Sequence, residues 1–306
     1  MHRVQNPGRS QGEGPWYLIA SHVAIDLHIH TTASDGSMPP LEVVESARKA
    51  GLSAIAVTDH DTVAGVCDIL KSGVPSDLAF LPGVEISSTP PDSFHSKGSF
   101  HILGYGIDVA SPSLVRALEG LRLERDMRNP KIVEKLVDLG VSITMDEVAR
   151  EASGQVVGRP HVAAVLVRKG VVLCTQEAFD RFLAKGRPAF VEKGRIPCEN
   201  AIHLIRKAGG VPVLAHPVTL GMDPSDLKPL LTVLSRMGLA GLEAYYSTHT
   251  PEFTRSMAEL AGNLGLFVTG GSDFHGAFKP DISLGVGRGD LHVPDDCYAK
   301  LIDALP

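Results

Sequence analysis

Apolar and polar residues alternate along the first third of the chain in four strand-like runs: VAIDLHIHT, LSAIAVTDH, LAFLPGVEIS and SFHILGYGI. Between the first two runs, PPLEVVESARKAG has apolar residues at helical spacing, prolines at its start and Gly51 at its end, so it is an expected helix. Strands that alternate with helices are typical of a parallel sheet. The pattern therefore predicts an α/β fold, with the sheet either open or closed into a barrel.

The same alternation returns in the last third of the chain. The expected helices there are CENAIHLIRKAGG, SDLKPLLTVLSRMG and PEFTRSMAELAGNLG. The expected strands that follow them are VPVLAHP, LAGLEAYYS and LFVTGGSDFHG. The two ends of the chain are thus predicted to share one α/β domain.

Residues 107–195 have a different pattern, with helical segments such as SPSLVRALEGLRLERDMRN and VGRPHVAAVLVRKG and no strand repeat. We expect a helical insertion here, between 23–106 and 196–306, and a flexible tail over residues 1–22. The insertion has 15 Lys and Arg against 12 Asp and Glu, whereas the whole chain has a net charge of −6. A basic insertion facing an anion is one interpretation of this bias, and a solvated helix face is the other.

The composition narrows the class of protein. The chain has 306 residues, of which 43% are hydrophobic and 21% charged, as in ordinary globular domains. No apolar run approaches the roughly 18 residues that span a membrane, and the N-terminus lacks the apolar core of a signal peptide, so we expect a cytoplasmic protein. The negative net charge disfavours binding to long nucleic acid. The sequence predicts no oligomeric state.

The four cysteines are far apart and form no C-x-x-C pair. This spacing disfavours both a thiolate zinc site and a disulfide framework, so we expect buried free thiols.

Three polar side chains interrupt the first apolar strand. Side chains alternate between the two faces of a strand, so Asp26, His28 and His30 point the same way. Two imidazoles on one face can chelate a metal ion, although a pair of hydrogen-bonded core histidines gives the same pattern.

The pattern recurs at other strand ends, and this recurrence favours metal binding. Because active sites of α/β barrels lie at the carboxyl ends of the strands, we expect these side chains to meet. Nitrogen and carboxylate ligands without thiolates suit Mn²⁺, Fe²⁺ or Zn²⁺, and the set exceeds what one ion takes up, so two or three ions are implied. These residues are Asp59, His60, Asp61, Glu85, His216, Asp273 and His275 at strand ends, and His101 near the start of the fourth strand.

Taken together, DLHIHTTASDG, AVTDHDTVAG, GVEIS, HILGYG, AGGVPVLAHP and GGSDFHG strongly resemble the polymerase and histidinol phosphatase (PHP) family of metal-dependent phosphoesterases. The resemblance covers residues 23–106 and 196–290. It implies a distorted (β/α)₇ barrel, similar to a TIM barrel, with a helical insertion domain and a trinuclear metal site at its mouth. VGRPHVAAVLVRKG further resembles the branch that hydrolyses nucleoside 3′,5′-bisphosphates such as pAp and trims short 5′-phosphorylated RNA from the 5′ end.

The resemblance also implies a ligand set. His28, His30, Glu85 and Asp273 would hold one ion, Asp35, His60 and His275 a second, and the bridging Glu85 would join His101 and His216 on a third. Mn²⁺ is the expected metal, with Fe²⁺, Zn²⁺ or Mg²⁺ as alternatives. We expect the three remaining aspartates to orient imidazoles or to form salt bridges rather than to bind metal. These are Asp26, Asp59 and Asp61.

Clustered divalent ions can activate water as a bridging hydroxide and neutralise charge in the transition state, so no protein nucleophile is needed and Glu85 is the expected centre of catalysis. In the GRPH sequence, Arg159 and His161 precede a helix and are candidates for holding a second phosphate. Arg128 and Arg195 are further candidates. Ser247 is a candidate substrate contact, and His249 a candidate substrate contact or proton donor, although Ser-x-His before Thr-Pro is also typical of a helix cap.

Three alternatives remain open from the sequence. The first is a phosphatase for AMP or a histidinol-phosphate-type substrate. The second is an amidohydrolase, because those enzymes also have H-x-H on a first barrel strand and a late strand-end aspartate. The third is a metal-binding PHP module without catalysis.

Overall fold

The computed structural model describes residues 24–152 and 157–306. The tail predicted for residues 1–22 lies outside the described residues. The described strands are β1 (Ile25–Ile29), β2 (Ala54–Val57), β3 (Ala79–Thr89), β4 (His101–Tyr105), β5 (Ile196–Pro197), β6 (Val211–Leu214), β7 (Gly241–Tyr246) and β8 (Phe267–Gly271). The described α-helices are α1 (Pro40–Lys49), α2 (Ala64–Ser72), α3 (Pro112–Asp138), α4 (Met145–Glu151), α5 (Arg159–Arg168), α6 (Thr175–Ala178), α7 (Cys198–Lys207), α8 (Pro224–Arg236), α9 (Pro251–Asn263) and α10 (Asp295–Asp303). Short turns of other helix types are η1 (Phe179–Leu183), η2 (Pro217–Leu220) and η3 (Gly276–Phe278).

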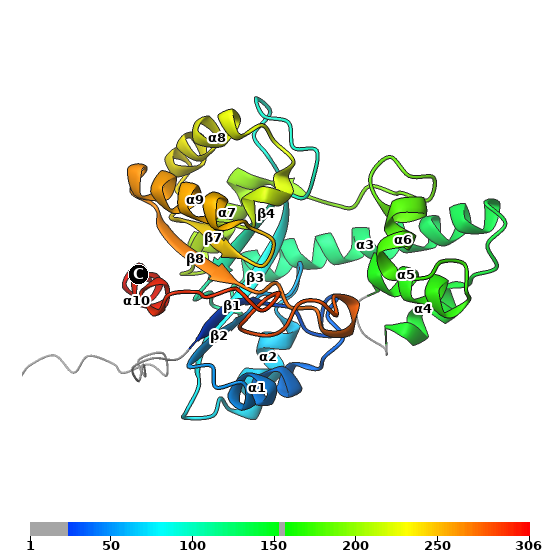
Figure 1. Ribbon diagram of the computed structural model, residues 1–306, viewed down its shortest axis with the longest axis horizontal. Helices are drawn as coiled ribbons and strands as arrows, with labels where there is room; N and C mark the ends of the chain where they lie inside the picture. The colour runs from blue at the N-terminus through cyan, green and yellow to red at the C-terminus, as the bar shows by residue number, and fades with distance from the viewer. Residues whose placement is uncertain (1–23, 153–156) are drawn as a thin grey trace, which may run out of the picture.

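Seven strands follow one another around the sheet in the order β1-β2-β3-β4-β6-β7-β8, and β5 pairs with β3 outside this path. Backbone hydrogen bonds also join the two ends of the path, because His30 N–H donates to Phe274 at 3.0 Å and Asp273 N–H donates to His28 at 2.9 Å. The sheet is therefore nearly closed, with helices around it (Figure 1). The predicted distorted α/β barrel is confirmed.

One strand runs against the expected direction. β4 pairs antiparallel with both β3 and β6, whereas the pairs β1–β2, β2–β3, β6–β7 and β7–β8 are parallel. The prediction of a parallel sheet is thus wrong at β4. The reversal has a consequence for the site, because it brings His101, the first residue of β4, to the edge where the parallel strands end.

The helices form where the sequence predicts them, because their apolar faces have a sheet to cover. In α1, Val43, Val44 and Ala47 are buried against β2 and β3 residues. The chain leaves this helix at Gly51, whose φ of 74° lies in the left-handed region that favours glycine. Burial on both faces of the barrel strands explains their almost continuously apolar sequence.

The segment between β4 and β5 is helical in its described part and extends to one side of the barrel (Figure 1). α3 is longer than the sequence indicates, since it continues past Pro130 to Asp138. Its first half, with Leu114 and Leu118, packs in the barrel core, and its second half packs in a separate apolar core with α4 and α5. The division into a barrel and an insertion over 107–195 stays a prediction, and α3 belongs to the cores of both.

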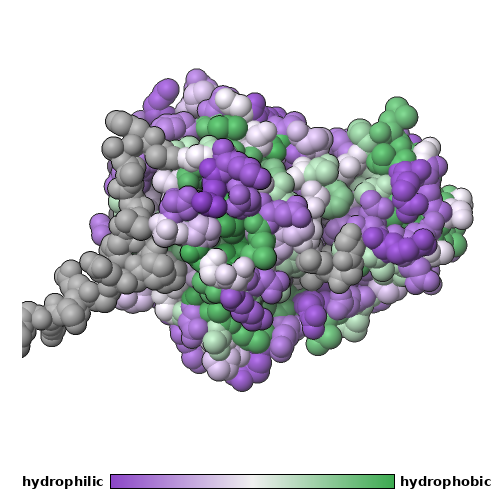
Figure 2. Space-filling model, turned by 90° about the horizontal axis from the view of Figure 1, so that it is seen from below, coloured by the Kyte–Doolittle hydropathy of each residue, from purple (hydrophilic) through white to green (hydrophobic). Residues whose placement is uncertain are grey.

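The cysteines correct another expectation. Cys198 and Cys297 are buried, but Cys67 is half-buried and Cys174 is exposed, so the expectation of buried thiols is wrong for Cys174. None of the helices in the described ranges is long and apolar enough to cross a membrane. On the face shown in Figure 2, apolar residues are interspersed with polar ones.

Candidate metal centre

The edge of the barrel where the parallel strands end gathers all of the predicted metal ligands. β1 carries one of them, His28, and β3 carries Glu85, whereas the others lie at the start of β4 or in the segments that follow β1, β2, β6 and β8. Four overlapping sets of them have candidate ligand atoms within 4.8 Å of one another, and shared residues link the sets into three groups. These residues are His28, His30, Asp35, His60, Glu85, His101, His216, Asp273 and His275.

The first group is built on His28 of β1 and on His30, the residue that follows this strand. The Nε2 atoms of His28 and His30 lie 3.1 Å apart, and both approach Glu85 Oε2, at 3.3 and 3.2 Å. Asp273 Oδ1 lies 3.6 Å from the first nitrogen and 3.2 Å from the second. Ligands of a tetrahedral ion at about 2.0–2.2 Å are separated by about 3.3–3.6 Å, so each of these separations suits two ligands of one ion.

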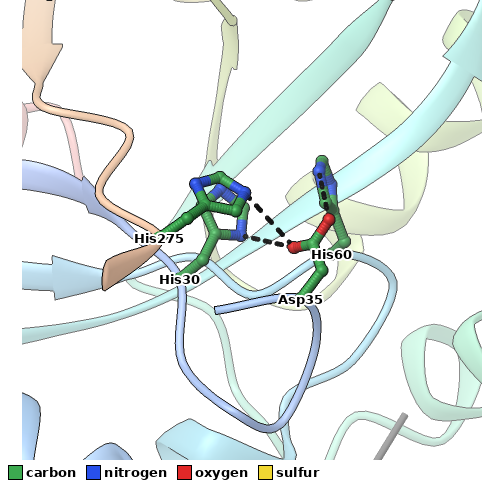
Figure 3. Close-up of side chains that lie close together, drawn as sticks. All are labelled: His30, Asp35, His60 and His275. Atoms are coloured by element: carbon green, nitrogen blue, oxygen red, sulfur yellow. Dashed lines mark ion pairs between the residues drawn. The ribbon is translucent and has the colours of Figure 1, made fainter. Parts of the chain in front are cut away.

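The second group surrounds Asp35, which lies in the loop after β1. Its carboxylate oxygens lie 3.3 Å from His275 Nε2, 3.7 Å from His30 Nδ1 and 3.9 Å from His60 Nε2 (Figure 3). Three imidazoles thus converge on one carboxylate from three different segments of the chain. His30 contributes its Nδ1 here and its Nε2 to the first group, so the two groups share an imidazole.

Glu85 joins the groups, because its two oxygens face different sets of imidazoles. Oε1 lies 2.7 Å from His101 Nδ1 and 2.8 Å from His216 Nε2, which makes the third group. Oε2 lies 2.9 Å from His60 Nδ1, but this buried nitrogen makes no hydrogen bond of acceptable geometry. A buried nitrogen that lies beside a carboxylate oxygen without a hydrogen bond fits two neighbouring ligands of one cation.

Hydrogen bonds on the outer side of the imidazoles leave the inner nitrogens free to bind metal. Glu243 Oε1 accepts from His28 Nδ1 at 2.8 Å, which keeps a proton on Nδ1 and leaves Nε2 as the nitrogen that faces the cluster. Thr219 Oγ1 lies 2.6 Å from His216 Nδ1, and His275 Nδ1 lies 2.8 Å from the main-chain carbonyl two residues earlier. The tautomers that follow from these partners are those that metal binding needs.

The carboxylates of the cluster are ionised. Burial opposes the ionisation of Glu85, but the neighbouring His60, His101 and His28 outweigh it and hold its pKa well below the usual range. Two further carboxyl groups behave in the same way, because nearby cationic groups outweigh the effect of burial and lower their pKa. These are Asp35 and Asp273.

Backbone strain is concentrated at this edge. Among the described residues other than glycine, only Asp61, His216 and Asp273 have positive φ, at 56°, 26° and 56°. Each follows the end of a strand, and such conformations cost about 1–3 kcal/mol and persist where surrounding contacts fix them. At His216 one such contact is a hydrogen bond of 2.7 Å from its backbone N–H to Glu243 Oε2.

Among the described residues, Asp26 and Asp59 pair with neither an imidazole nor a cationic side chain, so the expectation of one or the other is wrong for these two. Asp26 accepts hydrogen bonds from the backbone N–H and the hydroxyl of Ser272, at 2.8 and 2.6 Å. Asp59 accepts hydrogen bonds from the backbone N–H and the hydroxyl of Thr31, at 2.8 and 2.7 Å. Each carboxylate fixes a residue of a neighbouring segment beside the metal ligands.

Asp61 likewise holds a serine of a neighbouring segment, and it also forms a salt bridge, as expected from the sequence. It accepts from the N–H and hydroxyl of Ser87, both at 2.7 Å, and it pairs with Arg125 of α3. Arg125 is the group that most lowers the pKa of Asp61 against the opposing effect of burial.

A cavity of about 870 Å³ opens over the cluster. Seven of the nine predicted ligand residues line it, together with four cationic side chains from α3, α5 and the segment before β5. Within residues 24–152 and 157–306, three of the four form no ion pair with a carboxylate. The four are Arg125, Arg128, Arg159 and Lys193, of which only Arg125 has a carboxylate partner.

Arg128 is one of the three cations without a carboxylate partner in the described ranges. It is only 5% exposed, and its Nε has no hydrogen-bond partner. Burial, with Arg159 and Arg125 nearby, lowers its pKa to about 9, so it remains charged at neutral pH. Its Nη2 group donates to Asn129 Oδ1 at 3.1 Å, but no described carboxylate pairs with it, and a buried cation of this kind in a cavity wall is stabilised by an anionic ligand.

The structure places the two candidates of the GRPH sequence differently. Arg159 lines the cavity, donates to the carbonyl of Leu183 at 3.0 Å and lies between the rings of Phe179 and Phe190, each 5.6 Å from its guanidinium carbon. His161 is buried and does not line the cavity. Its Nδ1 accepts from the N–H of Gly158 at 2.9 Å, so it caps its own helix.

The other candidates are also divided. Ser247 lines the cavity, and its hydroxyl donates to the carbonyl of Ser272 at 2.6 Å. His249 does not line it, and its Nδ1 donates to the carbonyl of Ala244 at 2.8 Å. Arg195 pairs with Glu192 at 2.6 Å and also lies outside the cavity lining. The roles of His249 and Arg195 stay predictions without a contact to support them.

Five residues of the site were not singled out from the sequence, and Arg125, described above, is one of them. Glu243 fixes two ligand histidines, and Lys193 Nζ lies 3.2 Å from His101 Nε2. The Oδ2 atom of Asp273 accepts hydrogen bonds from Tyr246, at 2.8 Å, and from Lys279, at 2.6 Å. The only sequence signal for them was the position of Glu243 and Tyr246 on a strand next to other site-bearing strands.

Comparison with known proteins identifies a family. Residues 26–208 match the PHP domain. A 5′-3′ exoribonuclease of Haemophilus influenzae is 32% identical over 250 residues, which cover 82% of this chain and 89% of that protein. A 3′,5′-nucleoside bisphosphate phosphatase of Chromobacterium violaceum is 31% identical over 82% of this chain and 87% of its own. A phosphoribosyl 1,2-cyclic phosphate 1,2-diphosphodiesterase of Eggerthella lenta is 33% identical over 83% and 94%.

A solved structure agrees with these relatives. A protein from Bifidobacterium adolescentis assigned as a metal-dependent phosphoesterase superposes with a TM-score of 0.80 and is 30% identical. The match covers 91% of this chain and 95% of that protein, so it includes the helical segment as well as the barrel.

Proposed function

The chain belongs to the PHP family of metal-dependent phosphoesterases, and from that premise we propose that its substrate is a nucleoside that carries phosphate on both its 3′ and its 5′ side. The cavity has two features that suit anions, namely the ligand cluster and the wall of cations. The observation that carries the proposal is Arg128, a buried cation in that wall with an unpartnered Nε.

The names of the relatives support this substrate class. A nucleoside 3′,5′-bisphosphate has a phosphate on each side of one nucleoside, and so does the terminal nucleotide of a 5′-phosphorylated RNA. One binding geometry serves both molecules, with the 3′-side phosphate at the metal cluster and the 5′-phosphate at the cations. The product in either case is a nucleoside 5′-phosphate.

The proposed ligands are the nine residues of the cluster, with Glu85 as the bridge between centres. Their nitrogens and carboxylates, without thiolates, support two to three divalent ions, with Mn²⁺ first and Fe²⁺, Zn²⁺ or Mg²⁺ as alternatives. When bound, such ions lower the pKa of coordinated water and neutralise phosphate charge.

The chain's own residues have separate tasks in this proposal. Glu85 and Asp273 keep their ligand oxygens in place, the latter because Tyr246 and Lys279 hold its second oxygen. Arg128 and Arg159 bind and orient the phosphate that is not cleaved, and a guanidinium suits a phosphate because it can donate two parallel hydrogen bonds. Their charge also steers an anionic substrate into the cavity.

The test compares phosphate release from AMP, from adenosine 3′,5′-bisphosphate and from a short 5′-phosphorylated RNA, each with Mn²⁺. We expect the bisphosphate, or the RNA with release of 5′-mononucleotide, to be turned over with a higher kcat/KM than AMP. Preference for AMP would contradict the proposal and favour a phosphatase for single phosphates.

The variant Arg159→Ala tests whether the uncleaved phosphate binds at Arg159. Arg159→Ala is expected to lower kcat/KM for the bisphosphate by about 10- to 100-fold and to leave p-nitrophenyl phosphate nearly unaffected, because the latter has no second phosphate. Arg122→Ala, an exposed position of α3 outside the cavity lining, is the matched control. Equal losses on both substrates would refute the second-phosphate role.

A further inference from the structure

Two phenylalanine rings lie in the cavity lining beside the start of α5. Phe179 begins η1, and its ring lies 5.6 Å from the guanidinium carbon of Arg159, the first residue of α5. Phe278 ends η3, and its ring meets His161 of α5 edge-on at 5.0 Å. Both side chains are only partly buried, so part of each ring is open to the cavity.

These rings give the cavity an apolar part beside the cations. Val167 of α5 and Cys174, which precedes α6, also line it. A phosphate or a ribose gains nothing from apolar walls of this kind, because both are strongly hydrated. The occupant of this part should therefore have an apolar, flat surface and should be joined to phosphate groups.

A nucleobase meets this description. Aromatic side chains bind bases by stacking, and arginine guanidinium groups next to them add a cationic face. We propose that the base of the terminal nucleotide binds against Phe179 and Phe278, with Arg159 between the base and its 5′-phosphate. This inference rests on the proposed function for the positions of the two phosphates, and it adds the site that recognises the nucleoside.

The site is expected to accept different bases. Stacking depends little on base identity, since every base has an aromatic face. Gln176 is a lining residue that could distinguish bases by hydrogen bonding, but its amide already donates to Asp180 at 3.0 Å. The enzyme should thus turn over adenosine, guanosine, cytidine and uridine 3′,5′-bisphosphates with similar kcat/KM.

Variants of the two rings test the base site. Phe179→Ala and Phe278→Ala are each expected to lower kcat/KM for adenosine 3′,5′-bisphosphate by roughly 5- to 100-fold, the range for loss of one base–aromatic stack. Phe182→Ala is the matched control, because Phe182 lies on the same η1 turn, is half-buried and contacts Arg181, but does not line the cavity. Phe179→Leu keeps apolar packing if the alanine variant fails to fold.

An abasic substrate separates stacking from an indirect effect through Arg159. On 1,2-dideoxyribose 3,5-bisphosphate, which has both phosphates and no base, the phenylalanine variants are expected to match the wild type. A loss of the same size on this substrate would show that the rings act only by supporting Arg159, and would overturn the base site. The wild type should itself turn over the abasic compound more slowly than the nucleotide.

Cys174 offers a readout that does not depend on activity. Its exposed thiol lines the cavity, so adenosine 5′-phosphate bound as proposed should slow the alkylation of Cys174 by iodoacetamide in the wild-type protein. The alkylation rate is measured on the proteolytic peptide by mass spectrometry. Inorganic phosphate should not slow it, and the half-buried Cys67, outside the cavity lining, should react at an unchanged rate. Equal protection by phosphate and by the nucleotide, or no protection, would refute the base site even if the bisphosphate proves to be the substrate.

Discussion

Glu243→Gln should weaken metal binding although the residue is not a proposed ligand. Glu243 Oε1 accepts from His28 Nδ1 at 2.8 Å, and Oε2 accepts from the backbone N–H of His216 at 2.7 Å. A glutamine has the same shape but only one acceptor oxygen. One of the two histidines must therefore lose its hydrogen bond.

Either orientation of the amide harms the centre. If the amide nitrogen faces His216, two donors oppose each other at a backbone position that already has a φ of 26°. If it faces His28, that imidazole must accept at Nδ1, so its proton moves to Nε2, the nitrogen that faces the cluster. Loss of such a supporting contact typically costs 10- to 100-fold in metal affinity, or about 1.4–2.7 kcal/mol.

The assay is a Mn²⁺ titration of the chelator-treated protein, followed by metal content and by phosphate release. The midpoint for Glu243→Gln should rise by about 10- to 100-fold, and excess Mn²⁺ should restore most of the activity because the ligands themselves are intact. Glu259→Gln, an exposed position on α9, controls for the loss of one negative charge. An unchanged midpoint with a normal circular dichroism spectrum would refute this account of Glu243.

Two further predictions concern the cluster itself. Glu85→Gln should lower turnover of every phosphoester by at least about 10³-fold, because the bridge between the proposed centres is lost while the fold remains. Excess Mn²⁺ should not restore the activity. Activity near the wild-type level on any substrate would remove Glu85 from the mechanism. In the chelator-treated protein, burial and nearby cations lower the pKa of His275 to about 4, so an unfolded chain takes up this proton near pH 6.5 and the folded chain does not. The Tm should therefore fall as the pH drops from 6.5 towards 4, and His275→Asn should reduce the fall; a Tm that rises on acidification would contradict this.

The sequence was sufficient to find the candidate ligands because their signal is local. Histidines and carboxylates such as His28, His30 and Asp273 lie on or just after apolar strands, where ordinary core packing does not explain them. Parallel strands end at a common edge, so the convergence follows from the fold class without knowledge of distances.

The direction of β4 could not be predicted from its sequence. Its sequence, HILGY, has the same pattern of apolar residues whether the strand runs parallel or antiparallel. The direction is set by pairing with β3 and β6, which lie far apart in sequence. His101 was thus expected near the start of its strand, but its position among strand-end residues needed the structure.

Glu243 and the cations of α3 were missed or undervalued for another reason. A single glutamate in the strand GLEAYY resembles an ordinary polar position, and only the neighbouring strands show that it is completely buried against two histidines. Arg125 and Arg128 resemble the solvated face of a long charged helix. They are buried because α3 packs against the barrel with that face turned towards the cavity.

The same packing limits which substrates the proposed site can accept. Arg125 of α3 pairs with Asp61, whose carboxylate holds Ser87 and whose backbone N–H donates to the carbonyl of Glu85 at 2.9 Å. The cation wall is therefore tied by buried hydrogen bonds to the residue that bridges the proposed metal centres. Because this connection is short and buried, the spacing between the two anion sites should vary little. A substrate with a different distance between its phosphates would lose one of the two interactions, so its kcat/KM should be lower than that of the 3′,5′-bisphosphate. This difference in kcat/KM should become smaller in Arg125→Ala, which removes the salt bridge between α3 and Asp61.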